Sequence, residues 1–327
     1  MSVRRLPDRF GPRGLTALDR VLFARPRPDR VLVQYVPHAF GWKAMNLPFA
    51  AWVAARARRA APVWVMFHEV IFPFGWRPAH ALLGGVTRVM ARLVAGAAER
   101  VFVSIPAWAG WVRRLCPRAP RAEWLPVPSN VPAAADPAAV AAVRAGFPPG
   151  ASVVGHFGTF GGMNAALVGP PLAELLRHSP DRSALLVGRG SAEYRERFAA
   201  EHPDLAGRVA ATGPLPPAGV SAHLAACDLL VQPYPDGVSG RRGSAMAGLA
   251  LGVPTVTNVG FLSEPVWGTE SEGVAVVGSA GAAGLVAAAE AVLALPPAER
   301  AARGRAAAAW YRGRFALEHT LARLRAS

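Results

Sequence analysis

The chain has 327 residues, 52% of them apolar, and this length and composition predict two domains, each with a buried core. The formal charge of +15 suits nucleic acid or an anionic membrane, but the basic residues, nearly all arginine, are spread along the chain without a nucleic-acid-binding motif, so nucleic acid is not expected as a partner. No apolar run predicts a membrane-spanning helix or a secretory signal, and two cysteines without metal-type spacing fit a reducing cytoplasm.

Short β-branched apolar segments alternate with longer Ala- and Leu-rich segments, a pattern typical of βα units in a parallel sheet. The first half contains four predicted strands, at 30–36, 63–67, 100–104 and 122–127. Helices are expected near 47–60 and 79–98. The Pro- and Ala-rich segment 126–139 breaks both periodicities and is interpreted as a linker.

The second half repeats the alternation. Six strands are predicted, at 152–158, 183–188, 208–213, 228–234, 253–258 and 273–278. Helices are expected at 167–178, 191–201, 217–226 and 244–251. The sequence therefore predicts an α/β fold of two Rossmann-like, doubly wound domains facing a central cleft, with ligands bound at the carboxyl ends of the strands.

A glycine-rich turn, "GHFGTFGGMN" at 155–164, follows the first strand of the second half, and "GRG" at 188–190 follows the next strand. Glycines let backbone N–H groups approach a phosphate, and a helix that begins beyond the turn adds its positive end. The spacing is not that of a dinucleotide or P-loop fingerprint.

The loop "DGVSGRRGS" at 236–244 lies between a predicted strand and a predicted helix that Ser244 can cap. Arg241 and Arg242 are therefore expected at a helix N-terminus, where guanidinium groups and free N–H groups form a pyrophosphate site. Two solvated arginines without a ligand are the alternative interpretation.

In the first half, His68 and Glu69 follow the strand at 63–67. A histidine there can hydrogen-bond a sugar hydroxyl or act as a base, or it can cap the strand end by bonding to backbone. The segment after the strand at 30–36 combines aromatic, amide and charged side chains that suit a polyol acceptor, although ordinary loop packing explains them equally well. Its candidate acceptor-binding residues are His38, Gly41, Trp42, Lys43 and Asn46.

Four motifs follow one another in the second half: "LLVGRG", "ATGPLP", "AACDLLVQPY" and "ALGVPTV". Their order resembles that of the nucleotide-sugar-binding domain of GT-B glycosyltransferases, in particular retaining family 4. "WLPVPSN" resembles the interdomain segment of that family, and "AAAWYRGRFALEHTLARL" at 307–324 resembles its C-terminal helix. The resemblance, which covers the chain from about Arg30 onward, implies an acceptor-binding domain at 1–135, a nucleotide-sugar-binding domain at 136–305 and a helix that crosses back at 306–327.

The resemblance implies transfer of a sugar, with retention, from a nucleoside-diphosphate sugar to a hydroxyl of a small-molecule, glycan or lipid-linked acceptor. It implies no cofactor beyond this co-substrate, and since no "DxD" motif occurs, arginines rather than a metal ion are expected to balance the diphosphate. The expected catalytic residues are His68, Glu69, Arg241 and Arg242. The expected donor-binding residues are Gly158, Thr159, Gly161, Gly162, Gly188, Arg189, Asp236, Gly237, Val238, Ser239, Gly243 and Ser244.

The sequence also departs from that family. Ser239 and Ala247 stand where the family has two glutamates, no Arg and Lys follow the first strand of the second domain, and residues 1–29 contain no match to the usual opening strand. A non-catalytic sugar-nucleotide-binding relative or partner subunit is therefore the alternative function. A third class is a membrane-surface protein whose segments 55–61 and 88–100 lie on anionic lipid, a role compatible with catalysis at the inner membrane surface.

Overall fold

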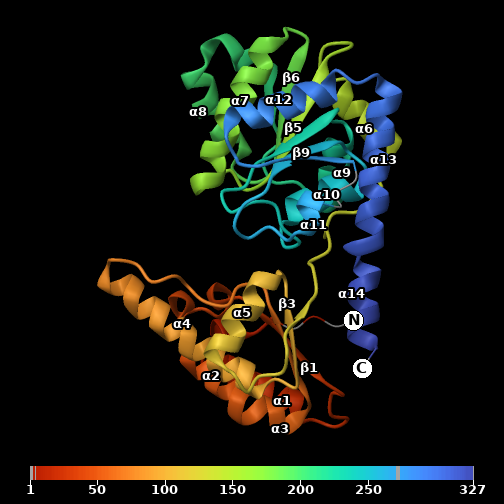
Figure 1. Cartoon of the computed structure of the whole chain (residues 1–327). Helices are drawn as coiled ribbons and strands as arrows, with labels where there is room; N and C mark the ends of the chain where they lie inside the picture. Colours follow the sequence, from red (N-terminus) through yellow and green to blue (C-terminus); the bar gives the residue numbers. More distant parts are fainter. Residues whose placement is uncertain (1–2, 4, 270–272, 327) are drawn as a thin grey trace. The chain divides into compact units, whose positions relative to one another are not determined.

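The computed structural model describes residues 3, 5–269 and 273–326 (Figure 1). The chain divides into two compact units, Met1–Pro126 (unit 1) and Val127–Ser327 (unit 2). Each unit contains one parallel sheet with helices packed against it. The predicted α/β class is therefore confirmed for both halves of the chain.

The sheet of unit 1 has four parallel strands, β1 (Val31–Tyr35), β2 (Val63–Phe67), β3 (Arg100–Val103) and β4 (Glu123–Trp124). All four lie within the predicted ranges. They are arranged in chain order, β1-β2-β3-β4, so the strand order does not reverse anywhere in the described sheet. The central strand β2 is buried along its whole length, which explains its uninterrupted apolar sequence.

Helices of unit 1 cover this sheet through a core that includes Tyr35, Phe67, Met90 and Val101. Three of them begin with proline at the first turn, where the missing N–H costs no hydrogen bond. The helices are α1 (Pro12–Leu22), α2 (Leu47–Trp52), the π-helical η4 (Val53–Ala57), α3 (Arg58–Ala60), α4 (Pro78–Ala97) and α5 (Pro106–Leu115), with 3-10 turns η1 (Pro7–Arg9), η2 (Pro37–Phe40) and η3 (Trp42–Ala44). Neither α1 nor α5 was predicted; α1 lies within residues 1–29, which contain no match to the usual opening strand.

The sheet of unit 2 has six parallel strands, all inside the predicted ranges except the strand Arg182–Val187, which begins one residue before its range. They are β5 (Ser152–Phe157), β6 (Arg182–Val187), β7 (Val209–Ala211), β8 (Leu229–Gln232), β9 (Thr255–Asn258) and β10 (Val274–Val277). Their order is β10-β9-β8-β5-β6-β7, so the winding direction reverses between β5 and β8. Loops diverge at such a reversal and leave room for a ligand at the carboxyl ends of the strands.

The helices of unit 2 pack on both faces of this sheet, in one core around Leu172 and Leu285 and another around Val153 and Leu224. They are α6 (Pro137–Arg144), α7 (Gly162–His178), α8 (Ser191–Glu201), η5 (Pro203–Arg208), α9 (Pro217–Ala225), α10 (Gly243–Ala250), α11 (Val266–Thr269), α12 (Ala282–Leu293), α13 (Pro297–Arg314) and α14 (Leu317–Arg325). The single C-terminal helix predicted at 307–324 is two helices, since the helix breaks at Phe315 and Ala316.

The aromatic side chains of α13 make it part of unit 2. Trp310 and Phe315 form a buried cluster with Trp267, and their ring centroids lie 5.1 Å and 5.7 Å from that of Trp267. Residues 127–136 of the predicted linker contain no helix or strand, but two hydrogen bonds fix them to unit 2. Val127 N donates to the Gly240 carbonyl at 2.8 Å, and Ser129 N donates to the Tyr311 hydroxyl at 2.9 Å.

No single helix in the described ranges has the length and apolar character needed to cross a membrane. One pair of helices, Ala282–Leu293 with Pro297–Arg325, passes the test of length and composition together, but the pair is bent by 116°.

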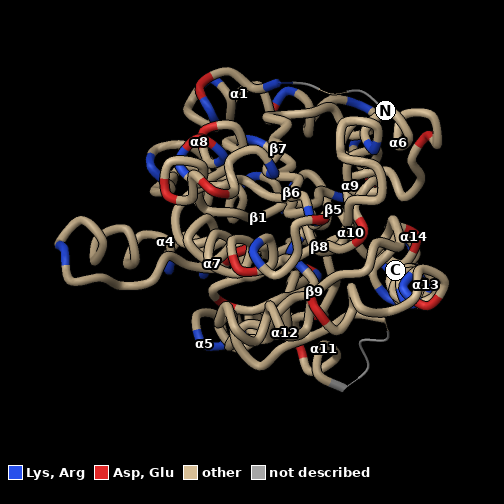
Figure 2. The backbone as a smooth tube through the Cα atoms, turned by 90° about the horizontal axis from the view of Figure 1, so that it is seen from above, with Lys and Arg blue, Asp and Glu red and all other residues tan. Residues whose placement is uncertain are grey.

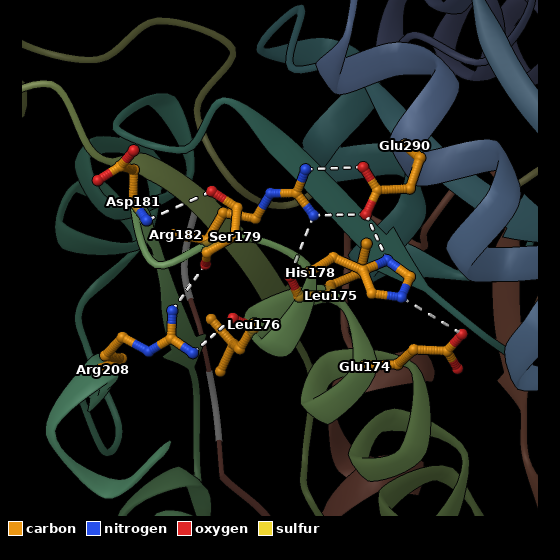
Figure 3. Close-up of polar contacts among 9 residues, drawn as sticks. All are labelled: Glu174, Leu175, Leu176, His178, Ser179, Asp181, Arg182, Arg208 and Glu290. Carbon is orange, nitrogen blue, oxygen red and sulfur yellow. Dashed lines mark hydrogen bonds and ion pairs between the residues drawn. The ribbon is translucent and has the colours of Figure 1, made fainter. Parts of the chain in front are cut away.

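A polar network joins the end of α7 to the amino ends of β6 and β7 (Figure 3). The pocket-forming loops follow the opposite, carboxyl ends of these strands. Arg208 donates to the carbonyls of Leu176 and Ser179, and Arg182 donates to the Leu175 carbonyl at 3.0 Å. These bonds satisfy carbonyls that the last turn of a helix leaves without a partner. Arg182 also donates to Glu290 of α12, with an Nη2–Oε2 distance of 2.7 Å.

The bond between Arg182 and Glu290 should make stability depend on pH. Arg182 lowers the pKa of the Glu290 carboxyl, so this stabilisation is complete above the ordinary carboxyl pKa and is lost as the pH falls through the lowered one. We expect Glu290→Gln to lower the free energy of unfolding by about 1 kcal/mol at neutral pH, a modest loss because Glu290 is partly exposed. Urea denaturation at neutral and acidic pH measures the difference, which should shrink in acid. Glu299→Gln, at an exposed position of α13, is the control, and an equal loss in both variants would contradict the assignment.

Candidate functional site

A pocket of about 560 Å³ lies in unit 2 where β5, β6, β7 and β8 end, next to the reversal of strand order. Its lining combines glycine turns, arginines and a partly apolar wall. Eight predicted residues line it: Gly158, Thr159, Gly188, Arg189, Arg241, Arg242, Gly243 and Ser244. Nine others line it without having been predicted: Asn130, Val131, Phe157, Asn164, Pro214, Leu215, Pro217, Val220 and Tyr234.

Two glycine turns form one side of the pocket through direct contact between their backbones. Gly188 has φ +121°, and a side chain there would collide with the Gly158 carbonyl oxygen, so this approach requires glycine. The N–H of Gly188 donates to the Thr212 hydroxyl at 3.2 Å, and that of Gly158 donates to the Val187 carbonyl at 3.1 Å. The turns are therefore fixed in position before any ligand binds.

Gly161 and Gly162 were also predicted to bind the donor, and they stand at the N-cap and first residue of α7. Neither lines the pocket. Asn164, in the first turn of the same helix, does line it. In this pocket, α7 thus contributes an amide side chain rather than the glycines themselves.

Arg241 and Arg242 precede α10 and share one carboxylate. Asp236 accepts a hydrogen bond from Arg241, with an Nη2–Oδ2 distance of 2.7 Å, and its other oxygen accepts one from Arg242. Asp236 was predicted to bind the donor; it does not line the pocket, and each of its oxygens is bonded to an arginine. The pair of arginines with Asp236 keeps a net positive charge, to which Arg189 adds another at the rim.

The Tyr234 ring packs against Arg242. The Arg242 guanidinium carbon lies 4.7 Å from the centre of the Tyr234 ring, a cation–π contact. The Tyr234 hydroxyl lies 2.7 Å from the Ser244 hydroxyl, while the N-cap position of α10 is Arg242 and has no side-chain cap. Ser244 was predicted to cap this helix; it bonds to Tyr234 instead.

Three predicted donor-binding residues of this loop do not line the pocket. Gly237 has φ +86° and faces the backbone of Gly260, which leaves no room for a side chain. Val238 packs against Trp267 in a buried cluster. Ser239 is fully buried, and its hydroxyl has no hydrogen-bond partner among the described residues. These residues shape the loop from within.

Glu264 anchors the loop, and it was not predicted. Its two carboxylate oxygens lie 2.9 Å and 3.1 Å from the Gly240 N–H, and one of them also accepts a bond from Trp267 Nε1 at 2.8 Å. Glu264 is 3% exposed, and burial raises the pKa of its carboxyl. The buried Glu264 carboxyl therefore holds the loop backbone at Gly240, the residue directly before the two arginines.

Ala247 of α10 lies beside the apolar part of the pocket lining, where the resemblance places a glutamate. Ala247 is fully buried in an apolar cluster with Val131 and Val220, both of which also line the pocket. Phe157 and Leu215 extend this apolar surface. The side of the pocket next to Ala247 can therefore pack against a ring or a sugar face, but it offers no charged side chain.

In unit 1, His68 is held between adjacent strands. Its Nε2 lies 2.6 Å from Gln34 Oε1, and its carbonyl accepts a bond from Trp108 Nε1 at 2.9 Å. Burial lowers the pKa of the His68 imidazole, which favours the neutral ring. Glu69, the next residue, is half-buried. With Nε2 donating to Gln34 Oε1, the neutral ring can accept one hydrogen bond from a bound hydroxyl at Nδ1.

The other candidate residues of unit 1 lie in and next to η2 and η3. Trp42 and Lys43 are exposed and have φ of 51° and 53°, and they follow Gly41 at φ 73°. His38 is exposed, with its ring edge toward Phe72. These four residues remain accessible to an acceptor.

Asn46 is a correction to the predicted acceptor-binding set. It is fully buried, its side-chain oxygen accepts from Phe49 N at 3.0 Å, and its amide nitrogen donates to the carbonyls of Phe10 and Phe40. Asn46 therefore caps α2 and fixes the loop before it, and its amide is not available to an acceptor.

No protein-family model and no curated protein matches the chain. Solved structures do match it. Sucrose-phosphate synthase from Thermosynechococcus elongatus superposes with a TM-score of 0.71 at 19% identity, over 96% of this chain and 76% of that chain. Anabaena Alr3699/HepE in complex with UDP and glucose superposes with a TM-score of 0.66 at 17% identity, over 96% and 80%.

A third similar structure is the UDP-forming α,α-trehalose-phosphate synthase from Burkholderia vietnamiensis, with a TM-score of 0.63 at 16% identity over 95% of this chain and 75% of that chain. At these identities, the likeness is evidence of the fold alone. The chain has the GT-B fold, as its sequence predicts.

Proposed function

We propose that this chain is a glycosyltransferase that moves a sugar from a nucleoside-diphosphate sugar to an acceptor hydroxyl. The observation that carries the proposal is the pocket at the strand reversal of unit 2, in which Arg189, Arg241 and Arg242 meet two glycine turns. None of the described residues that line it is acidic. Among the similar structures, Anabaena Alr3699/HepE was solved with UDP-glucose, which supports a nucleotide-sugar donor for this pocket.

The diphosphate would bind at the beginning of α10. The positive end of the helix dipole favours an anion there. A guanidinium has five N–H donors, so Arg241 and Arg242 keep donors for phosphate oxygens while bonded to Asp236. With Asp236 offsetting one charge, the three arginines present a net charge of about +2, close to that needed by a diphosphate.

The chemical step needs stabilisation of the charge that develops on the departing diphosphate. Arginines held by Asp236 and by the Tyr234 ring are fixed before the reaction, which is the condition under which such groups lower a barrier most. Transfer with retention requires no protein nucleophile in this scheme. Neutral His68 would orient a hydroxyl of the donor or of the acceptor, with Glu69 beside it.

The proposed acceptor is a small molecule, a glycan or a lipid-linked sugar with a free hydroxyl. His38, Gly41, Trp42 and Lys43 are the residues of unit 1 proposed to contact it, since they are accessible and combine a ring, a cation and a histidine. Aromatic faces pack against the apolar faces of sugars, and cations bond to their hydroxyls.

A second candidate function is binding without turnover. The observation that favours it is the burial of Ser239 and Ala247, where the resemblance places two glutamates. Turnover of purified protein with nucleotide sugars and hydroxyl acceptors separates the two functions: nucleotide binding without any sugar transfer or nucleotide release would assign the chain to the non-catalytic class.

The arginine site yields the main test. We expect Arg241→Ala and Arg242→Ala each to weaken nucleoside-diphosphate binding at least about tenfold, because each removes a charged hydrogen-bond donor from the phosphates. Calorimetric titration with UDP, GDP, dTDP and ADP measures the loss and identifies the base. Arg195→Ala, at an exposed position on α8, is the matched control. Unchanged affinity in both pocket variants would remove the donor site from this loop.

A second test concerns metal dependence. In the described part of the chain, no three His, Cys, Asp or Glu side chains gather as a metal-binding group, and the proposal assigns charge balance to the arginines. We expect nucleotide release in a transfer assay to change less than about twofold after EDTA treatment, because the arginine charges remain. A rate that falls to background with EDTA and returns with magnesium or manganese would contradict metal-independent transfer.

A third test concerns Glu264. Glu264→Ala leaves the buried N–H groups of Gly240 and Trp267 without their acceptor, so we expect a loss of about 2–3 kcal/mol in unfolding free energy and weaker nucleotide binding. Glu264→Gln keeps one acceptor oxygen and should recover part of both. Urea denaturation and titration with nucleotide measure the two effects. Full nucleotide affinity in folded Glu264→Ala would show that the anchor does not position the arginines.

A further inference from the structure

The positive charge of the chain is concentrated in unit 1. Residues 1–126 contain 20 of the 36 basic residues and 6 of the 21 acidic ones, a formal charge of +14. Residues 127–327 therefore contain 16 basic and 15 acidic residues, a formal charge of +1. A charge this uneven indicates a negatively charged partner for unit 1.

Unit 1 also exposes large apolar side chains at one projecting tip. Figures 1 and 2 both show the beginning of α4 and the segment before it extending beyond the rest of unit 1. Trp76 is 105% exposed there, and Phe74 and Leu82 are each 60% exposed. Val89, two turns further along α4, is 48% exposed. Exposed aromatic and aliphatic side chains that gather in this way mark an interaction surface.

The tip is held in shape by bonds from α4. The Thr87 hydroxyl accepts a bond from Phe72 N at 3.1 Å and donates to the Leu83 carbonyl. Arg88 donates to the Phe72 carbonyl at 3.1 Å, and its guanidinium carbon lies 3.7 Å from the centre of the Phe74 ring. The sequence predicted Arg88 on a lipid-facing segment. Its bond to Phe72 and its contact with the Phe74 ring instead stabilise the conformation of the tip.

The surroundings of the tip contain cations and no acids. The sequence between residues 70 and 98 has no aspartate or glutamate and includes Arg77, His80 and Arg92 beside the apolar side chains. In Figure 2, this segment is tan and blue only. From residue 70 to residue 122, eight arginines stand against one acid, Glu99.

We propose that the tip formed by Phe74, Trp76 and Leu82 inserts into the interface of an anionic lipid bilayer, with the arginines of unit 1 binding the headgroups. Tryptophan and phenylalanine favour the boundary between headgroups and acyl chains, and the surrounding cations add electrostatic attraction to anionic lipid. Two signals of this kind together give stable but reversible membrane binding.

A polyanion such as RNA matches the charge of unit 1 but not its tip. Phosphate backbones are bound by cations, and bases stack on aromatic faces. Leu82 and Val89 supply neither interaction, and both are exposed on the helix that carries the tip. A bilayer uses the aliphatic side chains, the aromatic side chains and the cations together. The bilayer is thus the partner that accounts for the whole surface, and it does so independently of the proposed catalytic function.

Co-sedimentation of the full chain with vesicles tests the proposal. The vesicles are phosphatidylcholine alone, or phosphatidylcholine with one part in four phosphatidylglycerol, each at low and at high salt. We expect binding to the anionic vesicles, weakened by salt because the charges are screened, and little binding to phosphatidylcholine alone. Trp76→Ala with Leu82→Ala should lower the partition coefficient at least about tenfold through lost apolar burial.

The matched control is Phe261→Ala, which removes an aromatic side chain of unit 2 that is 81% exposed and should leave vesicle binding unchanged. Thermal denaturation verifies that each variant is folded, which the exposure of both tip positions favours. The proposal is overturned if the wild-type chain does not bind anionic vesicles at low salt. It is also overturned if the tip variant binds as the wild type does and heparin removes both, since this outcome assigns the surface to polyanions in general.

Discussion

The reversal of strand order in unit 2 is the constraint on which the candidate site depends. Because β6 and β7 lie on one side of β5 and β8 lies on the other, the loops after β5 and β8 leave in opposite directions and open a pocket between them. Gly158 and Gly188 follow the paired strands β5 and β6, and the contact between their backbones fixes one side of the pocket. The sheet of unit 1 runs in a single direction in its described strands, so its candidate residues lie on loops rather than around a comparable opening.

Two acidic side chains outside the pocket lining hold the loop that carries its arginines. Asp236 and Glu264 are both buried or nearly so, and both lie beneath the segment that carries Arg241 and Arg242. Two buried carboxylates would be costly alone, but each is bonded to groups that must themselves be held in place. Asp236 thus fixes the arginine side chains, and Glu264 fixes the backbone before them, and neither acid lines the pocket. Asp236 offsets part of the positive charge of the arginines and fixes their geometry. Fixed geometry is the condition for electrostatic stabilisation of a transition state.

Much of the fold could be predicted because parallel strands are short, buried apolar runs with clear ends, as in Val63–Phe67 and Arg182–Val187. Eight of the residues that line the pocket were predicted because they stand in segments that follow strands, where parallel sheets bind ligands. Sequence order gave no indication of Glu264, which bonds to Gly240 from 24 residues away, or of the burial of Asn46. Helix α1 was not predicted; it begins with proline at its first turn, a position that suits proline because no hydrogen bond is lost there.

The total charge of the chain does not show how unevenly charge is distributed between the two units. A total of +15 spread over 327 residues suggests only a basic composition, but the division after Pro126 separates a nearly neutral unit from one that carries +14. The nearly neutral unit holds the pocket, where a few arginines act at short range. In unit 1, the charges act together over a surface, and long-range attraction to an anionic surface depends on that sum rather than on any single pair. Local and long-range electrostatics are therefore assigned to different parts of the same chain.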